Sequence, residues 1–367
     1  MAVKDGTRAR RITFIVPGDL DALTGGTIYD RRIIGGLRRR SWQVDPLMLA
    51  HGFPWPDAAA LAAAASRVAA IPDGSCVVAD GLAFGAMPVI AQHHARRLHW
   101  VALVHHPLAL ETGLDAVQRT HLFDSEQQAL SAARGVIVTS TSTARALAEY
   151  GVPGAQVRVV EPGTAAVAHV DGRHDRPNSG VLLCVGSVTP RKGHADLLDA
   201  LAGLQDRRWT LHCVGSLTRD VATVRQLRTR IDVHGLARRV VLHGELGHAA
   251  VQRHYARADA FVLPSHHEGY GMALAEALAY GLPVVSTSAG AIADTVPSDA
   301  GVLVPPGDVH ALRKALARLL DEPAWCAALA AGARAARDRL PSWPQAAGRF
   351  AAALVELVDG ASLRAGR

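Results

Sequence analysis

Two glutamates around a glycine turn mark the part of the sequence best suited to bind a ligand. Residues 268–276 read EGYGMALAE, with Glu268 and Glu276 at the two ends. The apolar run that ends at Pro264 predicts a buried strand, and the Ala- and Leu-rich run from Met272 to Tyr280 predicts a helix. Backbone N–H groups at such a helix start bind anions, and carboxylates accept hydrogen bonds from hydroxyl groups. This segment is therefore expected to bind a hydroxyl-rich, anionic ligand.

Two adjacent cations occupy a similar position earlier in the chain. The segment VGSVTPRKG contains Gly186, Arg191, Lys192 and Gly193 between an apolar run and a helical pattern. Full positive charges added to the donors of a helix start predict a diphosphate site. The P-loop pattern GxxxxGK[ST] is absent, and Arg-Lys pairs on surface turns are often only solvated.

Paired glycines and paired histidines are the candidates in the first half of the chain. Gly25 and Gly26 precede a predicted helix, where they would let the backbone approach a ligand closely. His105 and His106 end an apolar run that is stopped by Pro107. Adjacent residues on a strand point to opposite faces, so at most one of these histidines is expected to face a ligand.

Short apolar runs alternate with helical patterns along the chain, which predicts parallel sheets covered by helices. Because ligands sit at the carboxyl ends of the strands in such folds, the candidate residues are expected to line one cleft between two facing sheets. The predicted strands of the first series are Ile12–Val16, Val44–Leu49, Ser75–Ala79, Trp100–Val104 and Val136–Thr139. Those of the second series are Val181–Val185, Thr210–Val214, Val240–Leu242, Ala260–Leu263, Val284–Ser286 and Val302–Val304.

The fold class is therefore α/β, with two Rossmann-like parallel-sheet domains that face a central cleft. A polar stretch broken by Gly172 and Pro177 separates the two series and predicts a linker. The predicted divisions are an N-terminal domain at 1–167, the linker at 168–179, a C-terminal domain at 180–341 and, at 342–367, a helix that crosses back to the N-terminal domain.

Composition excludes several classes of protein. Of 367 residues 49% are hydrophobic and 20% charged, and the net charge of +6 is spread along the chain, which argues against nucleic-acid binding. The four cysteines are far apart and resemble buried thiols of a reducing compartment. No apolar run reaches the roughly eighteen residues of a membrane span. A cytoplasmic protein is expected, with peripheral contact to the inner face of the membrane left open by the basic charge.

Several of these motifs occur together and in order in one known family. The segments PSHHEGYGMALAEALAYGLPVVST and VGSVTPRKG, the Gly25-Gly26 loop and the histidine at the fourth strand end resemble glycosyltransferase family 4, whose members are retaining enzymes of the GT-B fold. Glu268 and Glu276, with seven residues between them, match the E-x7-E signature of that family. The resemblance spans most of the chain and is densest from Val181 to Pro306.

The resemblance implies a role for each candidate residue. Glu268 would bind the donor sugar hydroxyls, Glu276 the ribose hydroxyls, and Lys192 with Arg191 the leaving diphosphate. His105 would lie by the reacting sugar carbon. The remaining positions implied in nucleotide-sugar binding are Gly25, Gly26, Gly186, Ser187, Gly269, Tyr270, Gly271 and Met272.

The implied reaction moves a hexosyl group from a nucleotide diphosphate sugar to a hydroxyl-bearing acceptor. UDP-sugar is the favoured donor, with no other cofactor and no metal, since the cations and helix dipoles carry the charge and no Asp-x-Asp pair is present in a suitable loop. The acceptor remains open among small molecules, glycans and lipid-linked sugars. Many relatives carry an arginine at the position of Ser187, so either Arg191 compensates for it or the diphosphate is held by one cation fewer. Relatives also often carry Gly and Glu at the positions of Ala291 and Asp294.

Three other functions compete with this prediction. A nicotinamide-dependent oxidoreductase is disfavoured because Leu274 stands where a dinucleotide fingerprint needs Gly or Ala. A nucleotide-sugar epimerase or hydrolase of the same fold would act without an acceptor. A non-catalytic partner subunit would usually have lost one of Glu268, Glu276 and Lys192, and all three are present.

Overall fold

The computed structural model describes residues 10–167 and 180–364, and these divide into two compact units. The first unit contains residues 10–110, 114–162 and the segment from Trp343 onward, and the second contains residues 111–113 and the described part of 163–342. The division therefore falls at residue 163 rather than at 168, because Thr164 N–H donates to the Pro341 carbonyl at 2.7 Å. The predicted linker 168–179 lies outside the described residues.

A six-stranded parallel sheet forms the centre of the first unit, in the order β2-β1-β3-β4-β5-β6. Its strands are β1 (Arg11–Val16), β2 (Gln43–Met48), β3 (Cys76–Asp80), β4 (His99–Val104), β5 (Gly135–Val138) and β6 (Val157–Val159). Its helices are α1 (Gly25–Arg38), α2 (Ala58–Ala69), α3 (Gly81–Phe84), α4 (Pro88–His94), α5 (Ala116–Leu130), α6 (Thr141–Ala146), α14 (Trp343–Arg364), and the 3-10 turns η1 (Leu108–Leu110) and η2 (Gly154–Gln156).

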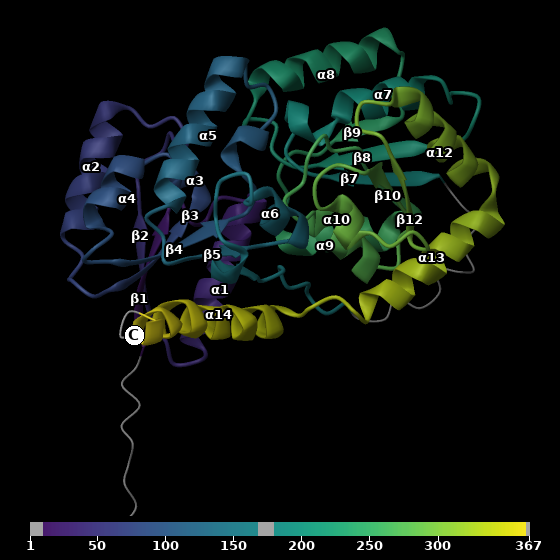
Figure 1. Ribbon diagram of the computed structural model, residues 1–367. Helices are drawn as coiled ribbons and strands as arrows, with labels where there is room; N and C mark the ends of the chain where they lie inside the picture. Colours follow the sequence, from purple (N-terminus) through teal and green to yellow (C-terminus); the bar gives the residue numbers. More distant parts are fainter. Residues whose placement is uncertain (1–9, 168–179, 365–367) are drawn as a thin grey trace, which may run out of the picture. The chain divides into compact units, whose positions relative to one another are not determined.

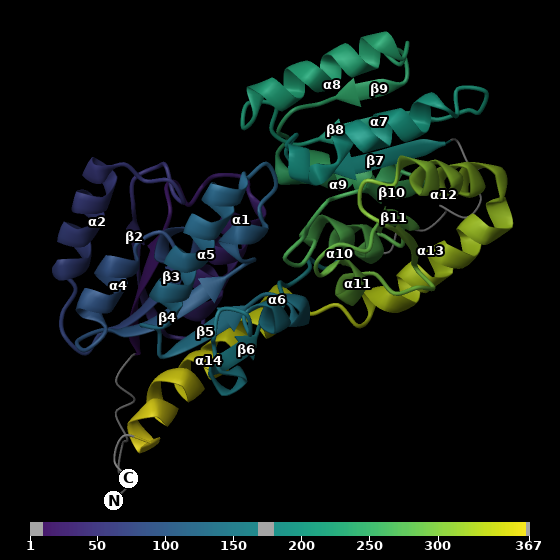
Figure 2. The ribbon, with the colours of Figure 1, turned by 45° about the horizontal axis from the view of Figure 1, so that its top comes forward.

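Helices cover both faces of this first sheet. On one side α2, α3, α4 and α5 contact one another, as Figures 1 and 2 show. On the other side α14 lies along α1, with Phe350 of α14 stacked near Phe14 and beside Tyr29. The last helix, although distant in sequence, therefore completes the core of the first unit.

A second six-stranded parallel sheet forms the centre of the second unit, in the order β12-β11-β10-β7-β8-β9. Its strands are β7 (Val181–Val185), β8 (Thr210–Val214), β9 (Val240–Leu242), β10 (Ala260–Leu263), β11 (Val284–Thr287) and β12 (Gly301–Val304). Its helices are α7 (His194–Ala202), α8 (Val221–Val233), α9 (His248–Arg257), α10 (Met272–Ala279), α11 (Ile292–Thr295), α12 (Val309–Asp321), α13 (Pro323–Arg337) and the 3-10 turn η3 (Pro190–Lys192).

Most residues of these strands are buried, and β10 and β11 are buried throughout, which explains their apolar sequences. On one face α7 contacts α8 and α12. On the opposite face Tyr255 of α9 stacks on Phe261 of β10, with ring centroids 5.8 Å apart. The α/β fold with two parallel-sheet domains is thus confirmed. None of the helices in the described residues is both long and apolar enough to cross a membrane.

Candidate active site

The second unit brings Glu268 together with Lys192 and Arg191. Glu268 follows β10 by five residues, and only 6% of the whole residue is exposed. Lys192 Nζ lies 2.5 Å from Glu268 Oε1, and Arg191 Nη1 lies 3.5 Å from Oε2. Ser265 Oγ donates a third contact to Oε1 at 2.6 Å. Residues 76 positions apart in sequence thus form one buried ionic group at the end of β10.

This arrangement holds Glu268 in its ionised form. Burial alone would raise the pKa of Glu268, but the charges of Lys192 and Arg191, with hydrogen bonds from Lys192 and Ser265, lower the pKa to about 2. Glu111 Oε1 lies 3.0 Å from Arg191 Nε, so the carboxylates of Glu268 and Glu111 both contact the pair of cations. Two adjacent cations can bind an anionic ligand through charge-assisted hydrogen bonds.

The turn that carries the two cations is fixed by close packing against β10. Gly193 follows η3 with φ +67°, and a side chain there would meet the Pro264 carbonyl oxygen at 2.0 Å. The backbone N–H of His266 donates to the Arg191 carbonyl at 2.7 Å. Only glycine combines this left-handed conformation with such an approach. The local sequence RKG therefore sets the position of both charges.

The remaining predicted donor residues divide between two places. Gly186 lies beside the Lys192 side chain, since a Cβ on Gly186 would meet Lys192 Cδ at 3.4 Å, and Ser187 follows it as a half-buried residue. Gly271 precedes α10, and no side chain caps this helix start. The predicted anion-binding residues there are Gly269, Tyr270, Gly271 and Met272.

Glu276 lies elsewhere in the unit, on the second turn of α10. It is half-buried and lines a small crevice together with Tyr255, Tyr280 and His248. The proximity of Glu276 contributes, after burial, to the raised pKa of the Tyr255 hydroxyl. The two glutamates of the E-x7-E pair thus have different surroundings, one with cations and one with aromatic side chains.

The first unit brings His105 together with two buried carboxylates that the sequence did not single out. His105 Nε2 lies 3.2 Å from Asp80 Oδ2 and 3.4 Å from Asp30 Oδ1. Asp30 and Asp80 are 0% and 2% exposed, while His105 keeps 19% of its side chain exposed. Gly26 lies next to this cluster, because a Cβ there would meet His105 Cδ2 at 3.4 Å. Gly25, in contrast, faces open space.

The carboxylates keep His105 protonated. Burial alone would lower its pKa, but the contacts with Asp30 and Asp80 raise the pKa of His105 to about 10. Burial and the charge of Asp80 in turn raise the pKa of Asp30. The ligand atoms of the three residues lie within 4.8 Å of one another, close enough to hold a metal ion. The expectation of a metal-free reaction therefore stays a prediction.

The sequence contained a signal for both aspartates. Asp80 ends β3, at the carboxyl edge of the sheet, and caps α3 by accepting from Leu82 N–H at 2.8 Å. Asp30 lies between buried apolar positions of α1. A charge in an otherwise buried strand end or helix face needs a partner. A third buried carboxylate, Glu126, accepts from Leu108 N–H at 2.8 Å and so holds η1, which begins three residues after His105.

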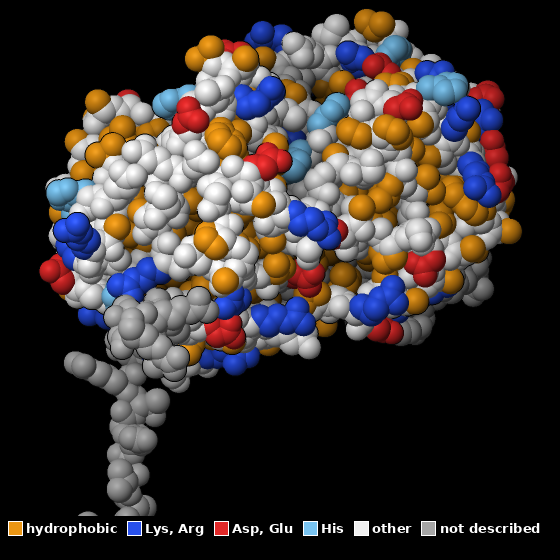
Figure 3. Space-filling model, in the orientation of Figure 1, with side chains coloured by type: hydrophobic (Ala, Val, Ile, Leu, Met, Phe, Trp, Pro, Cys, Tyr) orange, Lys and Arg blue, Asp and Glu red, His pale blue; other side chains and the backbone are white. Residues whose placement is uncertain are grey.

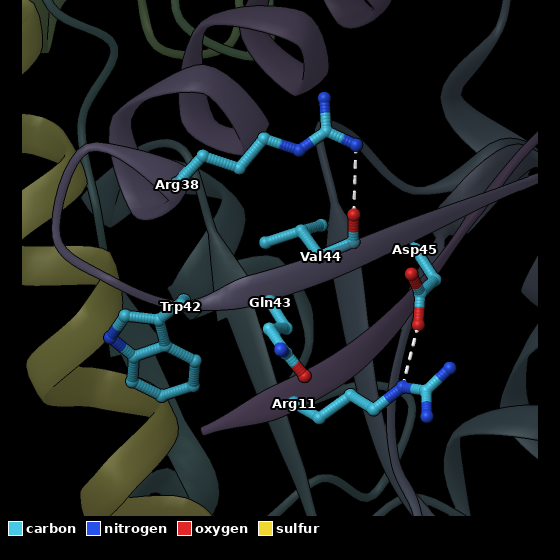
Figure 4. A pocket seen from close by; sticks show the side chains of 6 residues that line it. All are labelled: Arg11, Arg38, Trp42, Gln43, Val44 and Asp45. Atoms are coloured by element: carbon cyan, nitrogen blue, oxygen red, sulfur yellow. Dashed lines mark hydrogen bonds and ion pairs between the residues drawn. The ribbon is translucent and has the colours of Figure 1, made fainter. Parts of the chain in front are cut away.

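One surface pocket contains none of the predicted residues. It lies at the amino ends of β1 and β2, where Figure 4 shows Arg11 Nε bound to Asp45 Oδ2 at 2.7 Å and Arg38 bound to the Val44 carbonyl at 2.8 Å. Because all strands of the sheet are parallel, His105 after β4 is at the opposite edge. On the face seen in Figure 3, basic and acidic side chains are interspersed rather than gathered into one basic patch.

Comparison with known proteins agrees with this architecture. A family model described as "Glycosyl transferases group 1" matches residues 179–322. Glycogen synthase from Mycobacterium tuberculosis is 34% identical over 212 residues, which are 56% of this chain and 50% of that protein. D-inositol 3-phosphate glycosyltransferase from Xylanimonas cellulosilytica is 32% identical over 238 residues, 60% of this chain and 57% of that protein. The matches thus span about half the length of these relatives.

Solved structures are similar over nearly the whole chain. Sucrose-phosphate synthase from Thermosynechococcus elongatus superposes with a TM-score of 0.80 at 23% identity, covering 96% of this chain and 100% of that one. Anabaena HepE in complex with UDP and glucose superposes with a TM-score of 0.76 at 20% identity, covering 94% and 99%. Residues 179–322 thus match the group 1 glycosyl transferases, and the chain as a whole has the two parallel-sheet domains of the GT-B fold.

Proposed function

We propose that the protein is a retaining glycosyltransferase that moves a sugar from a nucleoside diphosphate sugar to a hydroxyl group without a divalent metal. The observation that carries this proposal is the buried group of Lys192, Arg191 and Glu268 in the unit that the family model matches. Two cations directly before the start of α7, which has no side-chain cap, suit a diphosphate. UDP is the favoured nucleotide, since a neighbour in fold was solved with UDP-glucose.

In the proposed reaction Lys192 and Arg191 bind the diphosphate, which leaves with the electron pair of the broken bond to the sugar carbon. The acceptor oxygen forms the new bond on the same face of the sugar, and its proton passes to the departing phosphate oxygen. Glu268 accepts hydrogen bonds from the donor sugar hydroxyls, and Glu276 from the ribose. Charge stabilisation and alignment supply the acceleration.

The first unit is proposed to serve the acceptor. His105 is a hydrogen-bond donor held by two carboxylates, which suits contact with a hydroxyl-rich substrate. The acceptor class is a sugar, a small hydroxylated metabolite or a lipid-linked glycan. The proposal places the reaction in the cytoplasm, because the four cysteines are free thiols, as in proteins of reducing compartments.

Thermal unfolding with UDP, GDP and ADP, each with magnesium or with EDTA, tests the donor side. A bound nucleotide raises the melting temperature with the logarithm of its concentration. We expect UDP to stabilise the protein equally in magnesium and in EDTA. Stabilisation by a nicotinamide dinucleotide and by none of the three nucleotides would refute the proposal, and a strict need for magnesium would refute its metal-free form.

Two variants then assign the roles within the group. Lys192→Ala should weaken UDP binding and turnover together, because the cation contacts the leaving group before and during transfer. Glu268→Gln should lower turnover more than UDP binding, since Glu268 contacts the sugar. The anomeric proton coupling of the product in NMR spectra reports the stereochemistry, and an inverted product would contradict the retaining mechanism. Sugar release at full rate without any acceptor would instead favour a hydrolase.

A further inference from the structure

Three groups of side chains in the described part of the chain have ligand atoms close enough together to hold a metal ion. One is the carboxylate and histidine cluster of the first unit, and one is sealed in the core of the second unit. The third is half-exposed and has no part in the proposed reaction. The groups are Asp30, Asp80 and His105; Cys184, His194 and Cys213; and His212, His243 and His254.

The third group, here called the three-histidine cluster, comes from three different elements of the second unit. His212 lies in the middle of β8, and His243 directly follows β9, the neighbouring parallel strand. His254 belongs to α9, the helix that covers this face of the sheet. Residues on either side of His212 point to the opposite face, because side chains alternate along a strand.

The backbone around the cluster is held independently of the three rings. His243 N–H donates to the Cys213 carbonyl at 2.9 Å, which extends the pairing of β8 with β9. Next to His254, Tyr255 anchors α9 through its stacking on Phe261 and a hydrogen bond from its hydroxyl to the Ala273 carbonyl at 3.1 Å. A site whose ligands stand on strands and a helix is more exact in geometry than one on loops.

The rings are already close to the spacing that a metal ion requires. His212 Nδ1 and His243 Nε2 share a hydrogen bond of 2.9 Å, and the ring centroids of His243 and His254 are 4.4 Å apart. The three ligand nitrogens all lie within 4.8 Å of one another. Nitrogens that each lie about 2.0–2.1 Å from a zinc ion are separated by up to roughly 4 Å. Small rotations of the side chains therefore suffice.

The rings can also be reached from the solvent. Partial exposure of all three rings leaves a path for the ion and room for a water ligand.

We propose that His212, His243 and His254 form a binding site for a divalent transition metal ion, with Zn²⁺ as the representative ion and water completing the coordination. Three histidines with an open fourth position are an established zinc ligand set. The site is separate from the group of Lys192 and Glu268, and the proposal does not depend on the proposed function.

Metal binding at this site would fasten α9 to β8 and β9. The same helix carries Tyr255 and His248, which line the crevice of Glu276. An ion held on one side of α9 would therefore stabilise the wall of the predicted ribose site on the other. The expected consequence is a higher melting temperature of the second unit, whether or not a nucleotide is present.

Calorimetric titration of the full chain, without a histidine tag, with zinc chloride tests the site. We expect one saturable ion per chain, and a fall in affinity of at least about tenfold in His243→Gln and in His254→Gln. Co²⁺ in place of Zn²⁺ should give the intense visible absorption of a tetrahedral site. His310→Gln, at an exposed position of α12, is the matched control and should bind as the wild type does.

Two more variants separate this site from the other groups. Zinc binding that survives both histidine substitutions but is lost in Cys213→Ala or in Asp80→Asn would place the ion elsewhere and overturn the proposal. The absence of saturable binding in the wild type would overturn it as well. Melting temperatures without zinc check that each variant folds. In the wild type, histidine side-chain NMR signals give a second readout: zinc should move three of them together, and unchanged signals would contradict the site.

Discussion

The buried charge of Glu268 can be tested by replacing it with glutamine, which keeps the shape and removes the charge. The ordinary pKa of a glutamate is 4.5, and in the folded protein the pKa of Glu268 is about 2. A difference of this size corresponds to about 3 kcal/mol of stability at neutral pH. The carboxylate is 8% exposed and its partners Lys192 and Arg191 are 16% and 19% exposed, so solvent screens them little. Removing one partner of a buried ion pair typically costs about 3–5 kcal/mol of stability, which independently gives a loss of similar size for Glu268→Gln.

Differential scanning calorimetry at pH 7 measures this loss. The second unit spans residues 163–342, and for a unit of that size 1 kcal/mol shifts the melting temperature by roughly 2–4 °C. Glu268→Gln should therefore lower the transition of this unit by about 6–12 °C. Glu322→Gln is the matched control, because Glu322 forms an ion pair of 3.0 Å with Arg318 in which both side chains are about half exposed. Such a pair is worth at most about 1 kcal/mol.

The sign of the pH dependence gives a second check. Because folding lowers the pKa of Glu268, its stabilisation is present in full above pH 4.5 and disappears as the pH falls toward 2. The difference between wild type and Glu268→Gln should therefore be constant from pH 5 to 7 and shrink below pH 4.5. A shift no larger than that of Glu322→Gln, or one that grows in acid, would refute the reasoning.

Three other perturbations probe the turns and the first unit. Gly193→Ala should destabilise more than Gly235→Ala in calorimetry, since both positions have φ +67° but only a Cβ at Gly193 meets a carbonyl oxygen at 2.0 Å; equal losses would contradict this. Asp80→Asn should lower the pKa of His105 from about 10, and an unchanged NMR titration would exclude the ion pair as its cause. Burial raises the pKa of Glu126 from 4.5 to about 8, so the folded protein favours the protonated form of this side chain. As the pH rises from 4.5 to 8, the wild type should therefore lose stability relative to Glu126→Gln. Parallel melting profiles of these two proteins would disprove that shift.

Most of the fold could be read from the sequence because buried parallel strands appear as continuous apolar runs. The eleven predicted strands all form, with ends that differ by at most one residue from those observed. The strand that was missed, β6, is only three residues long, and none of them is fully buried. A short strand at the edge of a sheet has no apolar run to reveal it, because only one neighbour covers it.

The site could be read less completely, for a different physical reason. Lys192 and Glu268 were singled out by their glycine turns and by the family resemblance, but their ion pair joins residues far apart in sequence. Asp30 and Asp80 were missed because one carboxylate in an apolar stretch has many uses, such as capping a helix. Only the fold shows that both face His105.

The charges of the two clusters support the proposed division of roles without reference to the family. Lys192 and Arg191 place two cations beside the carboxylates of Glu268 and Glu111, whereas protonated His105 is a single cation between the carboxyl groups of Asp30 and Asp80. A diphosphate is therefore favoured by the first group over the second, while a sugar that develops positive charge is stabilised by carboxylates. UDP affinity should therefore fall in Lys192→Ala and be unchanged or higher in the Asp80→Asn variant, as measured by calorimetric titration. A lower affinity in the latter would mean that the carboxylate cluster helps to hold the nucleotide, and the assignment of the donor to the second unit alone would then be wrong.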